Sequence, residues 1–88
     1  MKRKIDKVID GDTFRVKRKV NGSNYVRLAN VNAPEINARG GQTAKARLKK
    51  ALGSDANITT RGSSYGRVVA VVRNGRKNVN KKMKGYGY

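Results

Sequence analysis

The chain passes from a strand pattern into a polar turn at residues 26–35, which read VRLANVNAPE. Side chains of an extended chain alternate between two faces, so Val26 and Leu28 share one face and Arg27 points away from them. The turn that follows ends in Glu35, the only Glu of the chain. A second stretch, residues 9–13 (IDGDT), also sets acidic residues beside strand-like sequence. The two stretches therefore predict strand ends that carry polar groups.

Hydrophobic alternation and turn residues predict five strands. They cover residues 4–10, 13–20, 25–31, about 56–60 and 67–73. Residues 21–24 (NGSN) tolerate positive φ, so the second and third strands should form a hairpin. Residues 68–72 (VVAVV) are apolar on both faces, which predicts that the fifth strand is the most buried. Asn74-Gly75 predicts a further turn.

Two helices are expected. After a Gly-Gly break, apolar residues recur at helical spacing and predict an amphipathic helix at about 42–52. These residues are Ala44, Leu48, Ala51 and Leu52. Gly53 suits the C-terminal end of this helix. Asn80 is predicted to cap a short final helix that carries Met83.

The order of these elements predicts an OB-fold, a five-stranded Greek-key barrel, here with one helix between strands three and four and a short C-terminal helix. We expect a single domain over residues 1–88 with a thin core, because a domain of this size buries only about 60–65% of the surface that its unfolded chain exposes. OB-folds commonly bind oligonucleotides, but a fold alone does not fix a function.

The charge of the chain is strongly unbalanced, with 22 Lys and Arg against 5 Asp and Glu and a net charge of +17. A net charge of this size produces a positive electrostatic potential that attracts polyanions, and nucleic acid is the natural partner. A membrane partner is not expected, since neither helix has a large apolar face. No signal peptide is recognisable, and zero Cys gives no evidence about the compartment, so a cytoplasmic protein and a mature secreted domain both remain open. We expect a monomer.

Three of the scarce acids, Asp10, Asp12 and Glu35, lie at or beside the two polar strand ends. On an extended chain the carboxylates of Asp10 and Asp12 would project from one side about 6.5–7 Å apart and attract a cation. Oxygen donors without any His or Cys favour a hard ion, Ca²⁺ or Mg²⁺, over zinc or copper. Taken alone, Asp-Gly-Asp is also ordinary turn chemistry.

Three stretches resemble the signature motifs of the staphylococcal nuclease (thermonuclease) family. They are residues 9–13 (IDGDT), residues 26–35, and residues 65–70 (YGRVVA). Residues 41–45 resemble the start of the first helix of that family, and residues 74–85 resemble its second-helix region. The resemblance covers nearly the whole chain in the right order.

The resemblance implies an OB-fold nuclease that uses Ca²⁺, with Mg²⁺ less favoured, to cleave phosphodiester bonds of single-stranded or denatured DNA and RNA. It assigns metal ligation to Asp12, Asn32 and the backbone carbonyl of Ala33, and places Asp10 near the metal through water. By the same resemblance the catalytic residues are Arg27 and Arg67, which grip phosphate, and Glu35, which orients or deprotonates the attacking water. Tyr65 would lie beside the nucleotide.

The chain departs from the family pattern at three points. Asn32 stands where the family has a metal-binding Asp, which predicts weaker metal binding because Ca²⁺ affinity follows ligand charge. Ser63 stands where the family often has Asp, and the usual third helix is missing. Arg27 could instead reach water or pair with Asp10, Arg67 could be a solvated surface residue, and Tyr65 could be an aromatic at the barrel edge. Tyr86 and Tyr88 are expected to be frayed or lightly packed.

The sequence thus predicts a metal-dependent, sequence-nonspecific nuclease. The main alternative is a catalytically inactive OB-fold module that binds nucleic acid, and a third class is a small chromatin- or ribosome-associated basic protein. Retention of Asp12, Arg27, Glu35 and Arg67 together favours catalysis, because a pure binder gains nothing from a carboxylate beside phosphate.

Overall fold

The computed structural model describes all 88 residues and contains six strands and two helices. The strands are β1 (Lys2–Val8), β2 (Thr13–Val20), β3 (Ser23–Leu28), β4 (Asp55–Ser64), β5 (Arg67–Asn74) and β6 (Lys77–Asn78). The helices are α1 (Gly41–Leu52) and α2 (Val79–Gly85). Neither helix has the length and apolar composition that a membrane crossing requires.

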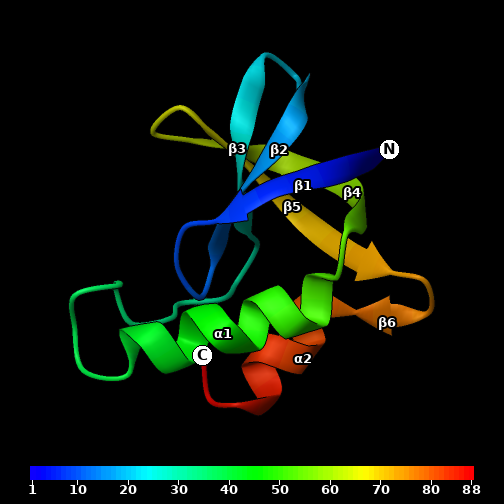
Figure 1. Cartoon of the computed structure of the whole chain (residues 1–88). Helices are drawn as coiled ribbons and strands as arrows, with labels where there is room; N and C mark the ends of the chain where they lie inside the picture. Colours follow the sequence, from blue (N-terminus) through cyan, green and yellow to red (C-terminus); the bar gives the residue numbers. More distant parts are fainter.

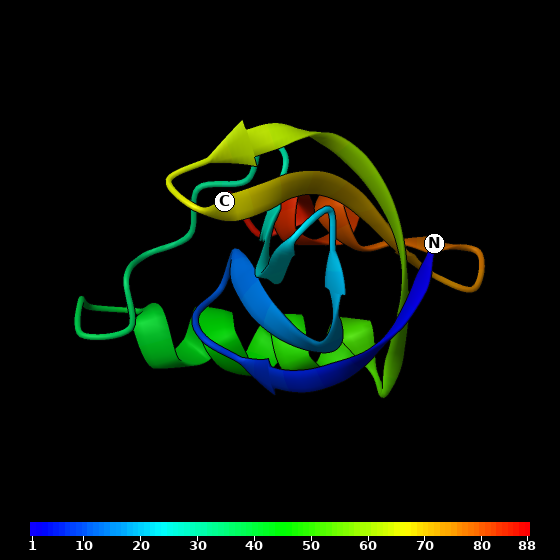
Figure 2. The same cartoon turned by 90° about the horizontal axis from the view of Figure 1, so that it is seen from above.

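The first five strands close into a barrel (Figures 1 and 2). Hydrogen-bonded neighbours follow the order β3-β2-β1-β4-β5, and a parallel pairing of β3 with β5 joins the two ends. In that pairing Val26 stands opposite Val68 and Leu28 opposite Ala70. This closed topology, with α1 inserted between β3 and β4, is the predicted OB-fold Greek-key barrel. The two-residue strand β6, which the sequence did not predict, pairs with the end of β5 at Arg73 and Asn74.

The hairpin between β2 and β3 turns on Asn21 and Gly22, with φ of 47° and 83°. Two consecutive positive φ values are the signature of a type I′ turn, whose twist matches that of the flanking strands. The turn after β5 likewise includes Gly75, at a φ of 60°. Both predicted turns are confirmed, and α1 ends at Gly53 as expected.

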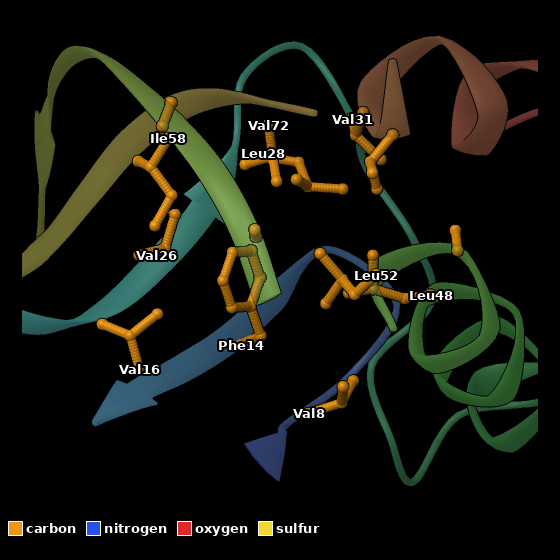
Figure 3. Packing of buried hydrophobic residues seen from close by; sticks show 14 of the residues in the cluster. Val8, Phe14, Val16, Val26, Leu28, Val31, Leu48, Leu52, Ile58 and Val72 are labelled. Atoms are coloured by element: carbon orange, nitrogen blue, oxygen red, sulfur yellow. The ribbon is translucent and has the colours of Figure 1, made fainter. Parts of the chain in front are cut away.

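The core joins the barrel interior to the buried face of α1. Phe14, Val26 and Leu28 from the strands pack in one cluster with Leu48 and Leu52 from the helix, and each is fully buried (Figure 3). Full burial of such a side chain stabilises the fold by about 1.5–3 kcal/mol. Figure 1 shows α1 and α2 on the same side of the barrel, so this cluster fixes the helices relative to the strands.

Several predictions about these elements were wrong. Strand β1 ends at Val8 instead of residue 10, and β3 ends at Leu28 instead of residue 31. Strand β4 runs to Ser64 instead of residue 60, because its polar second half pairs with β5. Strand β5 is not the most buried, since Val69 and Val71 face outward from the barrel and are only half-buried, and β2 buries four residues against its three.

The N-cap of α2 is Asn78, not Asn80: the Asn78 side chain accepts a hydrogen bond from the backbone N–H of Lys81. Asn80 is buried instead. Its amide accepts from the backbone N–H of Val72 and donates to the carbonyl oxygens of Ala29 and Ala70. Asn80 therefore satisfies backbone groups at the barrel seam, where β3 and β5 meet.

Candidate active site

One hollow of about 220 Å³ is lined by seven of the eight residues that the sequence singled out. They are Asp10, Asp12, Arg27, Asn32, Ala33, Glu35 and Arg67. The loop between β1 and β2 supplies the first two, the end of β3 and the loop after it supply the next four, and the start of β5 supplies the last. The barrel therefore brings together three stretches that are far apart in the sequence.

Asp12 is the buried centre of this pocket, with 7% of its surface exposed. One carboxylate oxygen, Oδ2, accepts a hydrogen bond from the backbone N–H of Ala33 at 3.1 Å and pairs with Nη2 of Arg27 at 3.4 Å. The other, Oδ1, accepts from the hydroxyl of Thr13 at 3.0 Å. Asp12 thus links the loop after β1 to the loop after β3.

Asp10 lies in a bend rather than on an extended strand, which corrects the expected side-by-side arrangement of the two carboxylates. Its Oδ1 accepts the backbone N–H of Asp12 at 3.1 Å, the local turn bond that Asp favours. Partial burial raises the pKa of Asp10, and the neighbouring Asp12 raises it further. A cation beside Asp10 would favour its charged form.

Arg27 holds the start of the loop that follows β3. Its Nη1 donates to the carbonyl oxygens of Leu28 at 3.1 Å and Val31 at 3.0 Å. Its Nη2 donates to Oδ1 of Asn32 at 2.9 Å, besides the pair with Asp12. The acidic partner of Arg27 is therefore Asp12, not the Asp10 considered from the sequence.

Arg67 and Glu35 face the same hollow from β5 and from the loop after β3. Nη1 of Arg67 donates to the Thr13 hydroxyl at 3.4 Å, which leaves most of the guanidinium donors available. The carboxylate of Glu35 is exposed and takes part in neither of the two ion pairs of the chain. Both side chains are therefore available to a ligand in the pocket.

Tyr65 does not line this pocket. It occupies the turn between β4 and β5 with a positive φ of 51° and has 96% of its surface exposed. Its ring therefore stands free at the tip of the hairpin.

Two glycines let the backbone close around the site. A Cβ on Gly11 would lie 2.5 Å from the Cβ atoms of both Ala33 and Ala44, and a Cβ on Gly41 would lie 2.0 Å from the carbonyl oxygen of Glu35. Both distances are far shorter than an ordinary van der Waals contact. Gly11 thus brings the first loop against the second, and Gly41 lets α1 begin directly against the backbone that carries Glu35.

Two contacts at the site were not predicted. Thr13 joins Asp12 to Arg67 through its hydroxyl, and its place beside Asp12 in the sequence was the available signal. The carbonyl oxygen of Tyr88 accepts the backbone N–H of Asn32 at 2.8 Å. No sequence signal pointed to this second contact.

The C-terminal tyrosines are more tightly held than expected. Nη1 of Arg47, on α1, donates to the hydroxyl of Tyr88 at 3.0 Å, and its guanidinium lies 4.2 Å from the centre of the Tyr86 ring. Cation–π contacts of this kind contribute about 0.5–1 kcal/mol at exposed sites. Arg47 thus ties α1 to the segment that bonds to Asn32.

The pocket offers oxygen donors for a hard cation. They are the Asp12 carboxylate, the Asn32 amide oxygen and the Ala33 carbonyl, with Asp10 beside them. No three Asp, Glu, His or Cys side chains cluster closely enough to hold a metal by themselves, so amide and backbone oxygens would have to complete the ligand set. Ca²⁺ accepts such mixed oxygen ligands, so the donor chemistry fits this ion.

Comparison with known proteins identifies the family of the chain. Residues 25–88 match the family described as staphylococcal nuclease homologues. The chain is also similar to endonuclease YhcR of Bacillus subtilis (strain 168), at 35% identity over an alignment 101 positions long, gaps included. That alignment covers 96% of this chain but only 8% of the endonuclease, so the chain spans a small part of that relative's length. The chain belongs to the staphylococcal nuclease family.

Proposed function

We propose that the chain is a metal-dependent nuclease domain that hydrolyses phosphodiester bonds of single-stranded or denatured DNA and RNA. The observation that carries the proposal is the single pocket in which Arg27, Arg67 and the unpaired Glu35 carboxylate converge around Asp12. Family membership supports nuclease-like chemistry, and the relative named as an endonuclease points the same way.

The two arginines supply planar donors for a phosphate. In-line attack on a phosphodiester builds negative charge on the non-bridging oxygens, and fixed guanidinium donors stabilise that charge at a defined geometry. Arg67 has spare donors at the pocket wall. Nη1 and Nη2 of Arg27 donate to four acceptors of the protein and so fix its orientation, which leaves Nε for a phosphate unless Asp12 or Asn32 gives up its bond. A Lys would not reproduce this bidentate geometry.

Glu35 is the general base of the proposed reaction. A water molecule in the pocket attacks phosphorus and its proton passes to the Glu35 carboxylate. The bond from phosphorus to the leaving sugar oxygen breaks, and that oxygen takes up a proton from solvent water. A base so placed contributes about 10²–10⁴-fold. The backbone at Glu35 is fixed by the bond from the N–H of Ala38 to its carbonyl oxygen at 2.9 Å and by the close approach of Gly41.

Ca²⁺ is the proposed cofactor, held by Asp12, Asn32 and the Ala33 carbonyl, with Asp10 nearby. When bound, it would polarise the phosphate and stabilise its developing charge. Arg27 already bonds to Asp12 and Asn32, so the same oxygens must serve both cations. With an amide in place of a second carboxylate, we expect modest affinity.

A catalytically inactive nucleic-acid-binding module is the second candidate. The observation in its favour is the Asn32 amide, which leaves the pocket with fewer charged donors than a strong Ca²⁺ site uses. The two candidates differ in the requirement for Glu35, since binding to a polyanion needs no carboxylate.

Glu35→Gln separates the two candidates. We expect turnover on heat-denatured DNA with Ca²⁺ to fall about 10²-fold or more, while binding to an oligonucleotide is kept or strengthened because one negative charge is removed. The control is Lys49→Ala on the exposed face of α1, which should cleave at the wild-type rate. Equal cleavage by Glu35→Gln and wild type would exclude Glu35 as the general base. Absence of cleavage in the wild type would favour the binding module.

A further inference from the structure

The tripeptide Lys-Arg-Lys occurs twice in the chain, at residues 2–4 and 17–19. Ile5 stands opposite Val16 in the antiparallel pairing of β1 and β2. The residues before Ile5 therefore run alongside the residues after Val16, and the two tripeptides meet. Five of their six side chains line one hollow of about 360 Å³, which has no other lining residue: Lys2, Arg3, Lys4, Lys17 and Arg18. These five residues form the basic patch.

No residue of the basic patch forms an ion pair, although Asp55 stands opposite Lys4 in the pairing of β1 with β4. The chain has two ion pairs, Asp6 with Arg15 and Asp12 with Arg27, and neither includes a patch residue. Like charges that face one another on neighbouring strands destabilise a sheet. Five cations around one hollow therefore carry an electrostatic cost that a bound polyanion would remove.

One patch residue is held in place. Nε and Nη2 of Arg3 donate to the carbonyl oxygen of Lys19 at 3.4 and 3.5 Å, and Nη1 donates to the carbonyl oxygen of Lys2 at 3.0 Å. These bonds bridge the two tripeptides and keep the guanidinium over the strands. The four other cations of the patch are exposed.

The basic patch lies at the opposite end of β1 from the candidate active site. The patch takes the first residues of β1 and the last of β2, whereas Asp10 and Asp12 lie in the loop that joins the other ends of these strands (Figure 1). Asp10 comes six positions after Lys4, which is at most about 20 Å of extended chain. At the spacing of about 3.4 Å per nucleotide that stacked bases have in one strand of a duplex, roughly six steps of a stacked single strand span this distance.

We propose that the basic patch is a second binding site for the phosphate backbone of nucleic acid, separate from the active-site pocket. A strand of more than about six nucleotides reaches both sites at once, so the patch selects long strands over short ones. Its part in substrate selection rests on the proposed nuclease function, but its binding of nucleic acid does not, because it needs neither the metal nor Glu35.

Binding of a mixed-sequence, 20-nucleotide single strand in chelator tests the patch without cleavage. Four to six phosphate contacts in the wild type predict a slope of about −3 to −4 for log affinity against log salt. The triple variant Lys4→Gln, Lys17→Gln, Arg18→Gln should have a slope shallower by about 2, since each lost contact on a single strand removes about 0.7. A control of equal charge, Lys49→Gln, Lys50→Gln, Lys81→Gln on exposed positions of the helices, should change the slope by less than about 0.7.

Two further measurements make the outcome decisive. In wild type, backbone amide NMR signals of residues 2–4 and 17–19 should shift when the oligonucleotide is added in chelator, a readout that needs no variant. Vesicles of phosphatidylserine are the probe for a lipid surface. Each of three results would overturn the proposal. They are equal slopes in the two triple variants, amide signals that do not shift, and a patch variant that loses binding to vesicles but keeps its binding to the oligonucleotide. Absence of cleavage in the wild type would leave all these results unaffected.

Discussion

Replacement of Gly11 by Ala tests the closeness of the two loops that form the pocket. A Cβ at this position would lie 2.5 Å from the Cβ atoms of Ala33 and Ala44 and 3.3 Å from the backbone carbonyl carbon of Ala44. Carbon atoms in contact stand about 3.5–4.0 Å apart. Each neighbour must therefore give way by about 1 Å, and one of them carries the carbonyl that we assign to the metal.

The expected cost follows from overpacking. Extra carbon in a closely packed site destabilises a fold by about 1–3 kcal/mol. For a domain of this size 1 kcal/mol lowers Tm by about 4–8 °C, so Gly11→Ala should lower Tm by about 4–24 °C. At temperatures where the variant is folded, a displacement of about 1 Å at Ala33 should reduce cleavage by up to about 10²-fold.

Thermal unfolding and cleavage, followed in parallel, provide the assay. Gly62→Ala is the matched control, because a Cβ there meets no atom within 4 Å. The double variant Gly11→Ala, Ala33→Gly should recover part of the lost Tm, since it removes one of the two closest contacts. A Gly11→Ala protein with the Tm and cleavage rate of wild type would refute the close packing of the loops.

Three further predictions concern the charges of the pocket. Asn32→Asp should tighten Ca²⁺ binding by adding a carboxylate to the ligand set. A titration that gives equal or weaker affinity would show that residue 32 is not a metal ligand. Arg67→Ala should reduce turnover more than Lys49→Ala, and equal rates would assign Arg67 to the solvated surface. The raised pKa of Asp10 means that the stability it contributes is present below its unfolded pKa and is lost as pH rises through the folded value. In chelator, Asp10→Asn should therefore unfold at a higher Tm than wild type at pH 7 and not at pH 3, and the same difference at both values would contradict the assignment.

Much of the barrel and the pocket was predictable because the signals are local. Alternation at a period of two and the Asn-Gly turn predict the β2–β3 hairpin. The acidic residues at the strand ends then lie together in the pocket. The polar stretch at residues 61–64 has no apolar pattern, so its pairing with β5 was missed. That pairing depends on β5 and not on the local sequence.

Long-range contacts account for the other corrections. Asn78 and Asn80 are equally good capping residues by type, and only the position of the barrel seam decides that Asn80 is buried against Ala29 and Ala70. The Tyr88 bond to Asn32 also joins segments more than fifty residues apart in the sequence. Periodicity and turn residues carry no information about such contacts.

The most direct test of the nuclease mechanism is the rate of cleavage of heat-denatured DNA as Ca²⁺ is titrated from excess chelator, in wild type and in Asp12→Asn. Asn keeps the shape and an acceptor oxygen but removes the charge that pairs with Arg27 at 3.4 Å. The mechanism predicts no cleavage by wild type in chelator, a saturable rise with Ca²⁺, and little or no rise in Asp12→Asn. Undiminished cleavage in chelator, or an unchanged titration in Asp12→Asn, would contradict it.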